Sequence, residues 1–337
     1  MAKITIVDVA KLAGVSTATV SRAMHTPNVL RPATLERVRA AMEEYGYVYN
    51  ATAGDFSRRK STVIGVLILS STAKVAAAVN AIQEISTDNG FPLITCTSGY
   101  NPRLERKYIQ QFLERGVAGV LVIGHMRENL SKLDELQERG IPCVFLWDSM
   151  PGTAYSFVGI DNEDAGFSMV SHLISQGHRR IGFMCGINAG VDRITKRFSG
   201  YKAALQAYEI PFDASLVCPV TSTFENGKSA MQTLMSLRHP PHAVACASDV
   251  LAMGAISAAY EAGFAVPGNV AVMGFDNSEL AAYTCPPLST VDVPGVEMGR
   301  LGVNALLTLI NDPNHPPIQQ TLETSLVLRA SSRPVLR

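Results

Sequence analysis

Apolar residues near the start of the chain follow the spacing of two short helices joined by a tight turn. Gly14 stands where the turn falls, and glycine adopts positive φ without the strain that a Cβ atom causes. Ser16 is a favourable N-cap for a second helix that begins near Thr17. The side chains that the first helix is expected to turn inward are Val7, Ala10, Leu12 and Ala13.

The second helix has a small, polar outer face. Val20, Ala23 and Met24 recur at i, i+3 and i+4, so we expect them to face inward. A small face with one arginine can enter a major groove, whereas in an ordinary αα-hairpin it would stay in solvent. The positions left on this outer face are Thr17, Ala18, Ser21, Arg22 and His25.

A third amphipathic helix is predicted over Ala33–Tyr45, with Pro32 at its first position and Gly46 just beyond its end. Residues 49–61 then lack apolar periodicity and contain Gly54, as a flexible linker would. The buried stripe of the third helix is expected to consist of Leu35, Val38, Ala41 and Met42.

From residue 61 onward, apolar runs alternate with amphipathic helices, which is typical of doubly wound parallel sheets. The run 63–69 is continuously apolar and suits a strand that is covered on both faces. We expect two α/β lobes with a cleft between them. The first would have strands over 63–69, 92–96, 119–123 and 142–147 and helices over 75–86, 105–115 and 130–139. The second would have strands over 158–161, 180–184, 243–247 and 270–274 and helices over 163–176, 195–208, 228–237 and 251–262.

The chain has no net charge, but its charges are unevenly distributed. Residues 1–60 contain nine Lys or Arg and five Asp or Glu, so they carry +4 and residues 61–337 carry −4. A basic N-terminal segment suits attraction to phosphates. We expect a cytoplasmic protein, because the sequence has no apolar run of about 18 residues, no apparent secretory leader, and six scattered cysteines that suit burial in a reducing compartment.

Three motifs resemble the DNA-binding headpiece of the lactose/galactose repressor (LacI/GalR) family of bacterial transcription factors: Asp8-Val9-Ala10, Ala13-Gly14-Val15-Ser16 and Ala18-Thr19-Val20-Ser21-Arg22. Further pieces that match the family in order lie at 177–181, 197–201, 248–252, 274–276 and 286–291. The resemblance implies an N-terminal helix-turn-helix domain over 1–48, a hinge over 49–61 and a core over 62–337 that is similar to periplasmic sugar-binding proteins. The implied first lobe spans about 62–160 and 293–322, with a helix over 296–310, and the second spans about 161–292 and 323–337.

The resemblance also implies a homodimer that binds pseudo-palindromic operator DNA. Arg22 suits a guanine, and the methyl groups of Thr17 and Ala18 suit contact with a thymine methyl. Phe56 falls where the family places an apolar wedge in the minor groove, although an incidental Phe in a flexible linker is the alternative. Phosphate contacts are expected from Ser16, Thr19, Ser21, His25 and Asn28.

Polar residues follow several predicted strands, at the sheet edge where ligands of α/β proteins bind. Hydroxyls, carboxylates, an arginine and a tryptophan together suit a polyol or sugar. The family resemblance points most to Arg197, Asp276 and the Ser248-Asp249 pair. The candidate effector contacts are Ser70, Thr72, Lys74, His125, Trp147, Asp148, Arg197, Ser248, Asp249 and Asp276.

Trp147-Asp148-Ser149, together with Ser70-Ser71-Thr72, resembles the gluconate-repressor branch of the family. With Lys74, His125 and Arg197 as candidate cations, this resemblance implies a sugar acid such as gluconate as effector. Plainer roles remain open, because aspartates commonly cap helices and Lys74 and His125 are residue types that are commonly solvated.

Motifs for other classes of function are missing. The sequence contains no dinucleotide-binding fingerprint, P-loop, zinc-protease motif or nucleophile elbow, so we expect no enzyme activity, metal or cofactor. Two alternatives stay open. One is a cytoplasmic sugar-binding module without operator-specific DNA binding, and the other is an α/β enzyme that would turn over a sugar substrate without needing residues 1–60.

Overall fold

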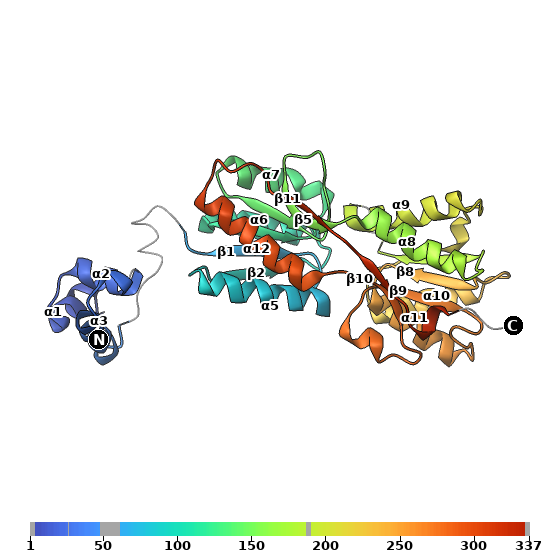
Figure 1. Ribbon diagram of the computed structural model, residues 1–337, viewed down its shortest axis with the longest axis horizontal. Helices are drawn as coiled ribbons and strands as arrows, with labels where there is room; N and C mark the ends of the chain where they lie inside the picture. The colour runs from blue at the N-terminus through green and yellow to red at the C-terminus, as the bar shows by residue number, and fades with distance from the viewer. Residues whose placement is uncertain (1–3, 26, 48–60, 187–189, 334–337) are drawn as a thin grey trace. The chain divides into compact units, whose positions relative to one another are not determined.

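The computed structural model describes residues 4–25, 27–47, 61–186 and 190–333. The chain divides into two compact units, residues 1–61 and 62–337 (Figure 1). Among the described residues, no helix is both long and apolar enough to cross a membrane. Four of their cysteines are buried, while Cys96 is half-buried and Cys285 is exposed rather than buried as expected.

The N-terminal unit is a bundle of short helices around a small apolar core. Thr5 begins it with a capping box, in which its backbone N–H and its hydroxyl both donate to Asp8 Oδ2, at 2.9 and 2.7 Å. These two hydrogen bonds hold the pKa of Asp8 below its usual range. The elements are α1 (Ile6–Ala13), α2 (Thr17–His25), the 3-10 helix η1 (Pro27–Val29) and α3 (Pro32–Glu44). Their buried core consists of Val9, Ala10, Ala13, Val20, Ala23, Val38 and Ala41.

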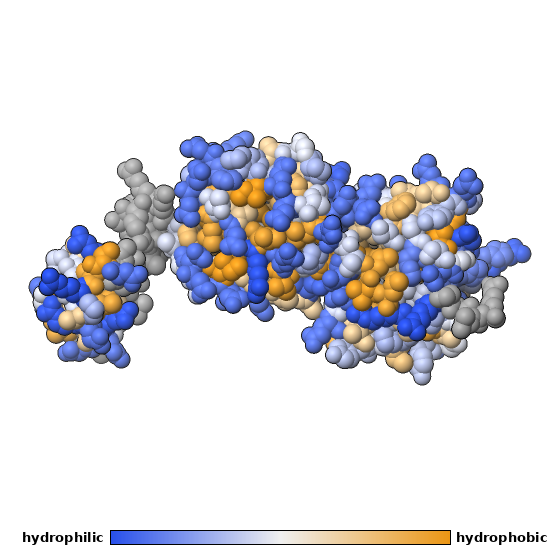
Figure 2. Space-filling model, in the orientation of Figure 1, coloured by the Kyte–Doolittle hydropathy of each residue, from blue (hydrophilic) through white to orange (hydrophobic). Residues whose placement is uncertain are grey.

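The turn between α1 and α2 forms as the sequence predicts. Gly14 has φ of 62°, and the Ser16 hydroxyl accepts a hydrogen bond from Thr19 N at 3.2 Å. The predicted inner face of α1 is partly wrong, because Val7 is 47% and Leu12 39% exposed, whereas Val9 is buried. The helix is therefore rotated relative to the predicted stripe, and apolar side chains remain on the headpiece surface (Figure 2).

The first lobe of the core is built on a six-stranded parallel sheet in the order β11-β5-β4-β3-β1-β2. Its strands are β1 (Ile64–Ile68), β2 (Leu93–Thr97), β3 (Gly119–Ile123), β4 (Cys143–Leu146), β5 (Ser156–Ile160) and β11 (Gln319–Leu322). Its helices are α5 (Ala73–Asp88), α6 (Pro102–Arg115), α7 (Leu130–Glu138), preceded by the 3-10 helix η2 (Arg127–Asn129), and α12 (Gly295–Asn311).

The second lobe has a six-stranded sheet in the order β12-β10-β9-β8-β6-β7, in which only β12 is antiparallel among the described strands. Its strands are β6 (Ile181–Cys185), β7 (Val217–Pro219), β8 (Ala243–Cys246), β9 (Ala271–Asp276), β10 (Ser289–Asp292) and β12 (Ser325–Val327). Its helices are α8 (Asn162–Ser175), α9 (Asp192–Ala207), α10 (Phe224–Met235) and α11 (Asp249–Glu261), with 3-10 turns η3 (Ala214–Leu216), η4 (Glu279–Ala282) and η5 (Ala330–Ser332).

Each sheet is covered by helices on both faces. Alternate residues of β1 show this, because Ile64 and Val66 join the apolar cluster of α5 and α12, whereas Leu67 joins that of α6 and α7. In the second lobe α8 and α9 cover one face and α10 and α11 the other. The helix expected over 296–310 is α12, and it packs on α5 in the first lobe.

Two glycines allow α8 and α9 to pack closely. A Cβ atom on Gly166 would lie 2.5 Å from the backbone O of Arg197, and one on Gly200 would lie 2.1 Å from the backbone O of Glu163. Only glycine fits at this crossing without displacing a helix. The close approach brings Arg197 of α9 against Asn162, the first residue of α8.

Short strands were missed in the sequence, namely β7, β10, β11 and β12. Each has only three or four residues, and β11 has mostly exposed side chains, so an apolar run does not mark it. The helix expected from Thr195 begins at Asp192 instead. That difference places Arg193 on α9 rather than in a loop.

Candidate functional site

The outer face of α2 lies in solvent as predicted. Thr17, Ala18 and Arg22 are exposed, and Ser21 is half-buried. Ser16 is exposed at the N-terminus of α2, where its hydroxyl lies 3.0 Å from that of Thr19. His25 is the last residue of α2, Asn28 lies exposed in η1, and Phe56 falls outside the described residues.

The core contains a cavity at the carboxyl ends of strands from both sheets. Its lining residues follow β1, β2 and β4 in the first lobe and β6, β7, β8 and β9 in the second. This position is where ligands of open α/β sheets bind. The structure brings six of the predicted effector residues to this cavity: Ser70, Thr72, Trp147, Arg197, Ser248 and Asp276.

Arg197 is the most enclosed charged group of the cavity. Its Nε donates to Asn162 Oδ1 and its Nη1 to the Ala247 carbonyl, both at 2.8 Å. The guanidinium also stacks on the Phe275 ring, 3.6 Å from the ring centroid. Burial lowers the pKa of Arg197 to about 10, so it remains protonated at neutral pH. The contacts fix its orientation toward the cavity.

Asp276 supplies the cavity's acceptor. It is the last residue of β9 and has φ of 110°, and its carboxylate makes no hydrogen bond with the described residues. Burial raises the pKa of Asp276, while the positive charges of Arg197, Arg193 and Lys74 oppose that rise. A carboxylate so placed can accept hydrogen bonds from the hydroxyls of a ligand.

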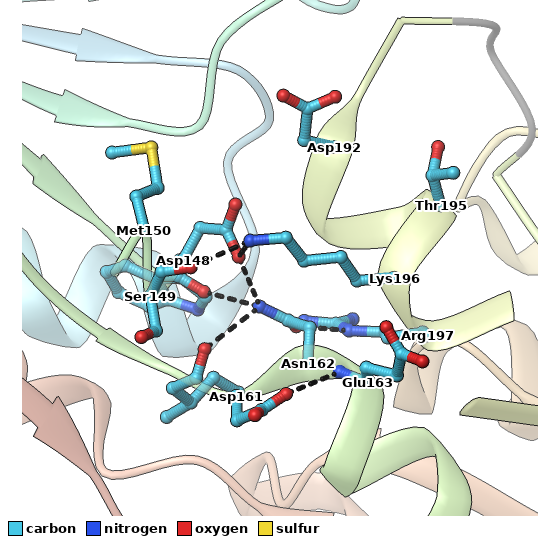
Figure 3. Close-up of polar contacts among 12 residues, drawn as sticks. Asp148, Ser149, Met150, Asp161, Asn162, Glu163, Asp192, Thr195, Lys196 and Arg197 are labelled. Carbon is cyan, nitrogen blue, oxygen red and sulfur yellow. Dashed lines mark hydrogen bonds and ion pairs between the residues drawn. The ribbon is translucent and has the colours of Figure 1, made fainter. Parts of the chain in front are cut away.

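Trp147 and Asp148 directly follow β4. Figure 3 shows Asp148 beside Asn162 of α8 and Lys196 of α9. Asn162 Nδ2 donates to the Trp147 carbonyl at 2.8 Å and to Asp148 Oδ1 at 3.2 Å. Lys196 Nζ donates to Asp148 Oδ1 at 2.8 Å and to the Ser149 carbonyl at 2.7 Å. These bonds join the two lobes. Burial raises the pKa of Asp148, and the Lys196 ammonium opposes that rise.

Asp249 lies outside the lining of this cavity. Its carboxylate accepts from Thr290 Oγ1 at 2.5 Å and from Ser278 N at 2.6 Å, so it ties α11 to the ends of β9 and β10. Burial raises its pKa to about 6, and the negative charge of Asp276 adds to that rise. The helix cap is Ser248, whose hydroxyl accepts from Leu251 N. Asp249 is thus occupied by structural bonds, although it does not cap its own helix.

Lys74 and His125 do not line the cavity either. Lys74 Nζ pairs with Asp292 Oδ1 at 3.3 Å, across the two lobes. His125 is 6% exposed and packs edge-on against Phe145, and burial lowers its pKa to about 4. The imidazole is therefore neutral near pH 7, which corrects the expectation that His125 supplies a positive charge.

His125 makes stability depend on pH. The pKa of His125 in the folded protein lies below that of a free imidazole. The neutral imidazole is therefore compatible with the full free energy of unfolding above about pH 6.5, and stability is lost as the pH falls toward 4. Between about pH 7 and about pH 4.5 the free energy of unfolding should fall in both proteins, and we expect the fall to be about 2–3 kcal/mol smaller in His125→Gln than in the parent. Urea unfolding at both pH values measures this difference. An equal loss in both proteins would contradict the prediction.

Sequence analysis missed polar lining residues at Tyr100, Arg193 and Ser222. Tyr100 Oη donates to Ser70 Oγ at 3.2 Å, and the hydroxyls of Ser222 and Ser248 are hydrogen-bonded. Tyr100 and Ser222 lie in loops without a motif. Arg193 could have been predicted from the sequence, because it lies four residues before Arg197 and so occupies the same face of the helix.

Comparison with known proteins defines the class. Residues 5–50 match the model of bacterial regulatory proteins of the lacI family, and residues 170–332 match a periplasmic binding protein-like domain. The helix-turn-helix headpiece, the two-lobed core and these matches together define a DNA-binding transcriptional regulator.

The chain belongs to the LacI family. It is 32% identical over 330 residues to the HTH-type transcriptional repressor CytR of Escherichia coli (strain K12), with 98% of this chain and 96% of CytR covered. The lac repressor dimer bound to operator and the anti-inducer ONPF is similar with a TM-score of 0.85 at 25% identity, covering 98% of this chain and 100% of that one. The transcriptional regulator CelR in complex with cellobiose has a TM-score of 0.73 at 30% identity, covering 97% and 99%. The predicted fold class and family are confirmed, whereas the gluconate branch stays a prediction.

Proposed function

We propose that this protein is a cytoplasmic transcriptional repressor whose affinity for operator DNA is switched by a small carbohydrate, a sugar acid such as gluconate. The observation that carries the proposal is the cavity in which Arg197 and Asp276 meet between the lobes. A guanidinium and a carboxylate at one cavity suit a ligand with both hydroxyl donors and acceptor oxygens. Trp147, buried at the cavity wall, offers an apolar face to the carbon skeleton.

The switch requires two lobe arrangements of different effector affinity. Among the described residues, three ion pairs join the lobes: Lys196–Asp148, Arg127–Asp192 and Lys74–Asp292. An effector that favours another arrangement has to change these contacts. We propose that the change alters the spacing of the two hinges in a dimer and so weakens or strengthens the binding of operator DNA.

The DNA-binding part of the proposal assigns base contacts to Thr17, Ala18 and Arg22, which the structure leaves exposed. The phosphate contacts and the Phe56 wedge are proposed as the sequence predicts them. A homodimer, as in the lac repressor structure, would place two headpieces on a near-palindromic site. The second lobe carries exposed apolar side chains that a partner could cover: Tyr260, Leu280 and Tyr283.

Selection of genomic fragments by the full-length protein tests the function. We expect enrichment of a near-palindromic site, a binding constant that falls steeply with salt, and a change of affinity when one carbohydrate is added. Trp147 is the only tryptophan of the chain and lines the cavity, so its fluorescence reports ligand binding separately.

The same experiment separates the other classes. Carbohydrate binding without any operator preference would favour a sugar-binding module, and turnover of the carbohydrate by the protein would favour an enzyme. The relative CytR is named a transcriptional repressor, which supports the regulatory function over both alternatives.

A further inference from the structure

Arg193 is a buried cation whose Nη1 atom finds no hydrogen-bond partner among the described residues. It is the second residue of α9, is 8% exposed, and its Nη1 atom is fully buried without a hydrogen bond. Within the described ranges it also forms no ion pair. A buried guanidinium N–H without an acceptor is costly, so a group that supplies the acceptor would bind here with a clear advantage.

Neighbouring cations are all engaged. Arg197 donates to Asn162 and Ala247, and Lys196 to Asp148 and Ser149. Lys74 and Arg127 pair with Asp292 and Asp192. Around the cavity, in the part of the chain that the structure describes, Arg193 is therefore the cation that remains available to an anion from outside the protein.

Arg193 lies at the boundary between two neighbouring cavities. It lines the cavity between the lobes and also a smaller adjoining pocket, whose apolar wall includes Phe145, Leu146, Met150 and Val191. Gly124 makes room for the guanidinium, since a Cβ there would lie 3.0 Å from Cζ and 3.1 Å from Nη1. In such surroundings, poor in water, an arginine binds an anion more strongly than at a surface.

The charges nearby favour one kind of anion. Asp276 lines the cavity, and Asp148 and Asp192 line the adjoining pocket, so three carboxylates surround this region. They would repel a dianionic phosphate more than a monoanionic carboxylate. A carboxylate also matches the planar fork of a guanidinium with two parallel hydrogen bonds.

We propose that Arg193 binds the carboxylate of an acidic effector, while Asp276 and Arg197 hold its hydroxyl groups. The inference rests on the proposed function and sharpens it, because it assigns the choice of acid over neutral sugar to a residue other than Arg197. Arg193 is thus a specificity residue of the cavity.

The test compares matched ligand pairs on the full-length protein. Gluconate with glucitol, galactonate with galactitol and glucuronate with glucose differ in the carboxylate and share most of the skeleton, and glucose 6-phosphate tests a phosphate. Calorimetry and Trp147 fluorescence measure affinity. We expect one acid to bind at least about tenfold more tightly than its neutral partner, a preference that Arg193→Gln abolishes while binding of the neutral partner is retained.

Control variants distinguish a specific role of Arg193 from a general effect of charge and from loss of folding. Lys202→Gln removes a positive charge from an exposed position of the same helix and is expected to keep the preference for the acid, whereas Arg193→Lys is expected to keep part of it. Thermal unfolding checks that each variant is folded. A neutral sugar or glucose 6-phosphate that binds more tightly than every acid would overturn the inference and leave the repressor function standing. Operator DNA that responds to no carbohydrate at all would overturn both.

Discussion

Replacing Arg197 by methionine is expected to lower the free energy of unfolding of the core by about 3–5 kcal/mol and to abolish the response to effector. The substitution leaves Asn162 Oδ1 and the Ala247 carbonyl without their donor and removes the cation stacked on Phe275. Asp276 also loses the positive charge that most opposes the rise of its pKa. Urea unfolding followed by Trp147 fluorescence measures the stability of the core.

Two further variants make the Arg197 prediction specific. Lys202→Met removes an exposed cation from the same helix and is expected to change stability by less than about 0.5 kcal/mol. Arg197→Lys keeps the charge but not the fork, so we expect an intermediate loss. If Arg197→Met unfolded at the same urea concentration as the parent protein and still bound effector, the role assigned to the buried guanidinium would be wrong.

Arg22→Ala is expected to cost roughly 1–3 kcal/mol of operator discrimination, which is up to about 150-fold in relative affinity, with the fold intact. Arg22 is exposed on the outer face of α2, so its removal opens no cavity in the headpiece. Gel shifts with the selected operator and with base-pair variants of it measure the discrimination.

Arg39→Ala is the matched control for Arg22→Ala. Arg39 is exposed and belongs to α3 rather than to the predicted recognition helix α2, and its removal changes the charge of the headpiece equally. We expect it to weaken binding to all DNA by a similar small factor and to leave the preference for the operator unchanged. Equal effects of the two substitutions on discrimination would show that Arg22 acts only through its charge.

Local patterns were sufficient for the helices and the turn of the headpiece and for the main strands of both sheets. The Gly14 turn and the Ser16 cap depend on contacts within a few residues, so the sequence predicts them directly. The helical spacing of Val20 and Ala23 likewise identified the inward face of α2. Continuous apolar runs likewise identified β1, β3 and β8, because strands covered on both faces need no polar positions. The rule that ligands bind at the carboxyl ends of strands then located the cavity and six of its residues.

Other features depend on groups far apart in the chain. Which face of α1 is buried was decided by packing against α2 and α3, so Val7 stays exposed although it is apolar. Asp249 was predicted to meet effector, but Thr290 and Ser278, 41 and 29 positions away, occupy its carboxylate. His125 loses its charge because burial beside Phe145 penalises the imidazolium, and sequence alone does not show burial.

By itself, the sequence determined the class of protein, the order of its helices and main strands, and the types of side chain that reach the cleft. Only the tertiary structure decided which of those side chains are free to bind. Arg197 and Arg193 are one helical turn apart and identical in chemistry, yet Asn162 and Ala247 satisfy the first, and no described residue satisfies Nη1 of the second. The physical reason is that a hydrogen bond requires a partner within about 3 Å, and the partners of a buried group are set by which distant segments pack beside it.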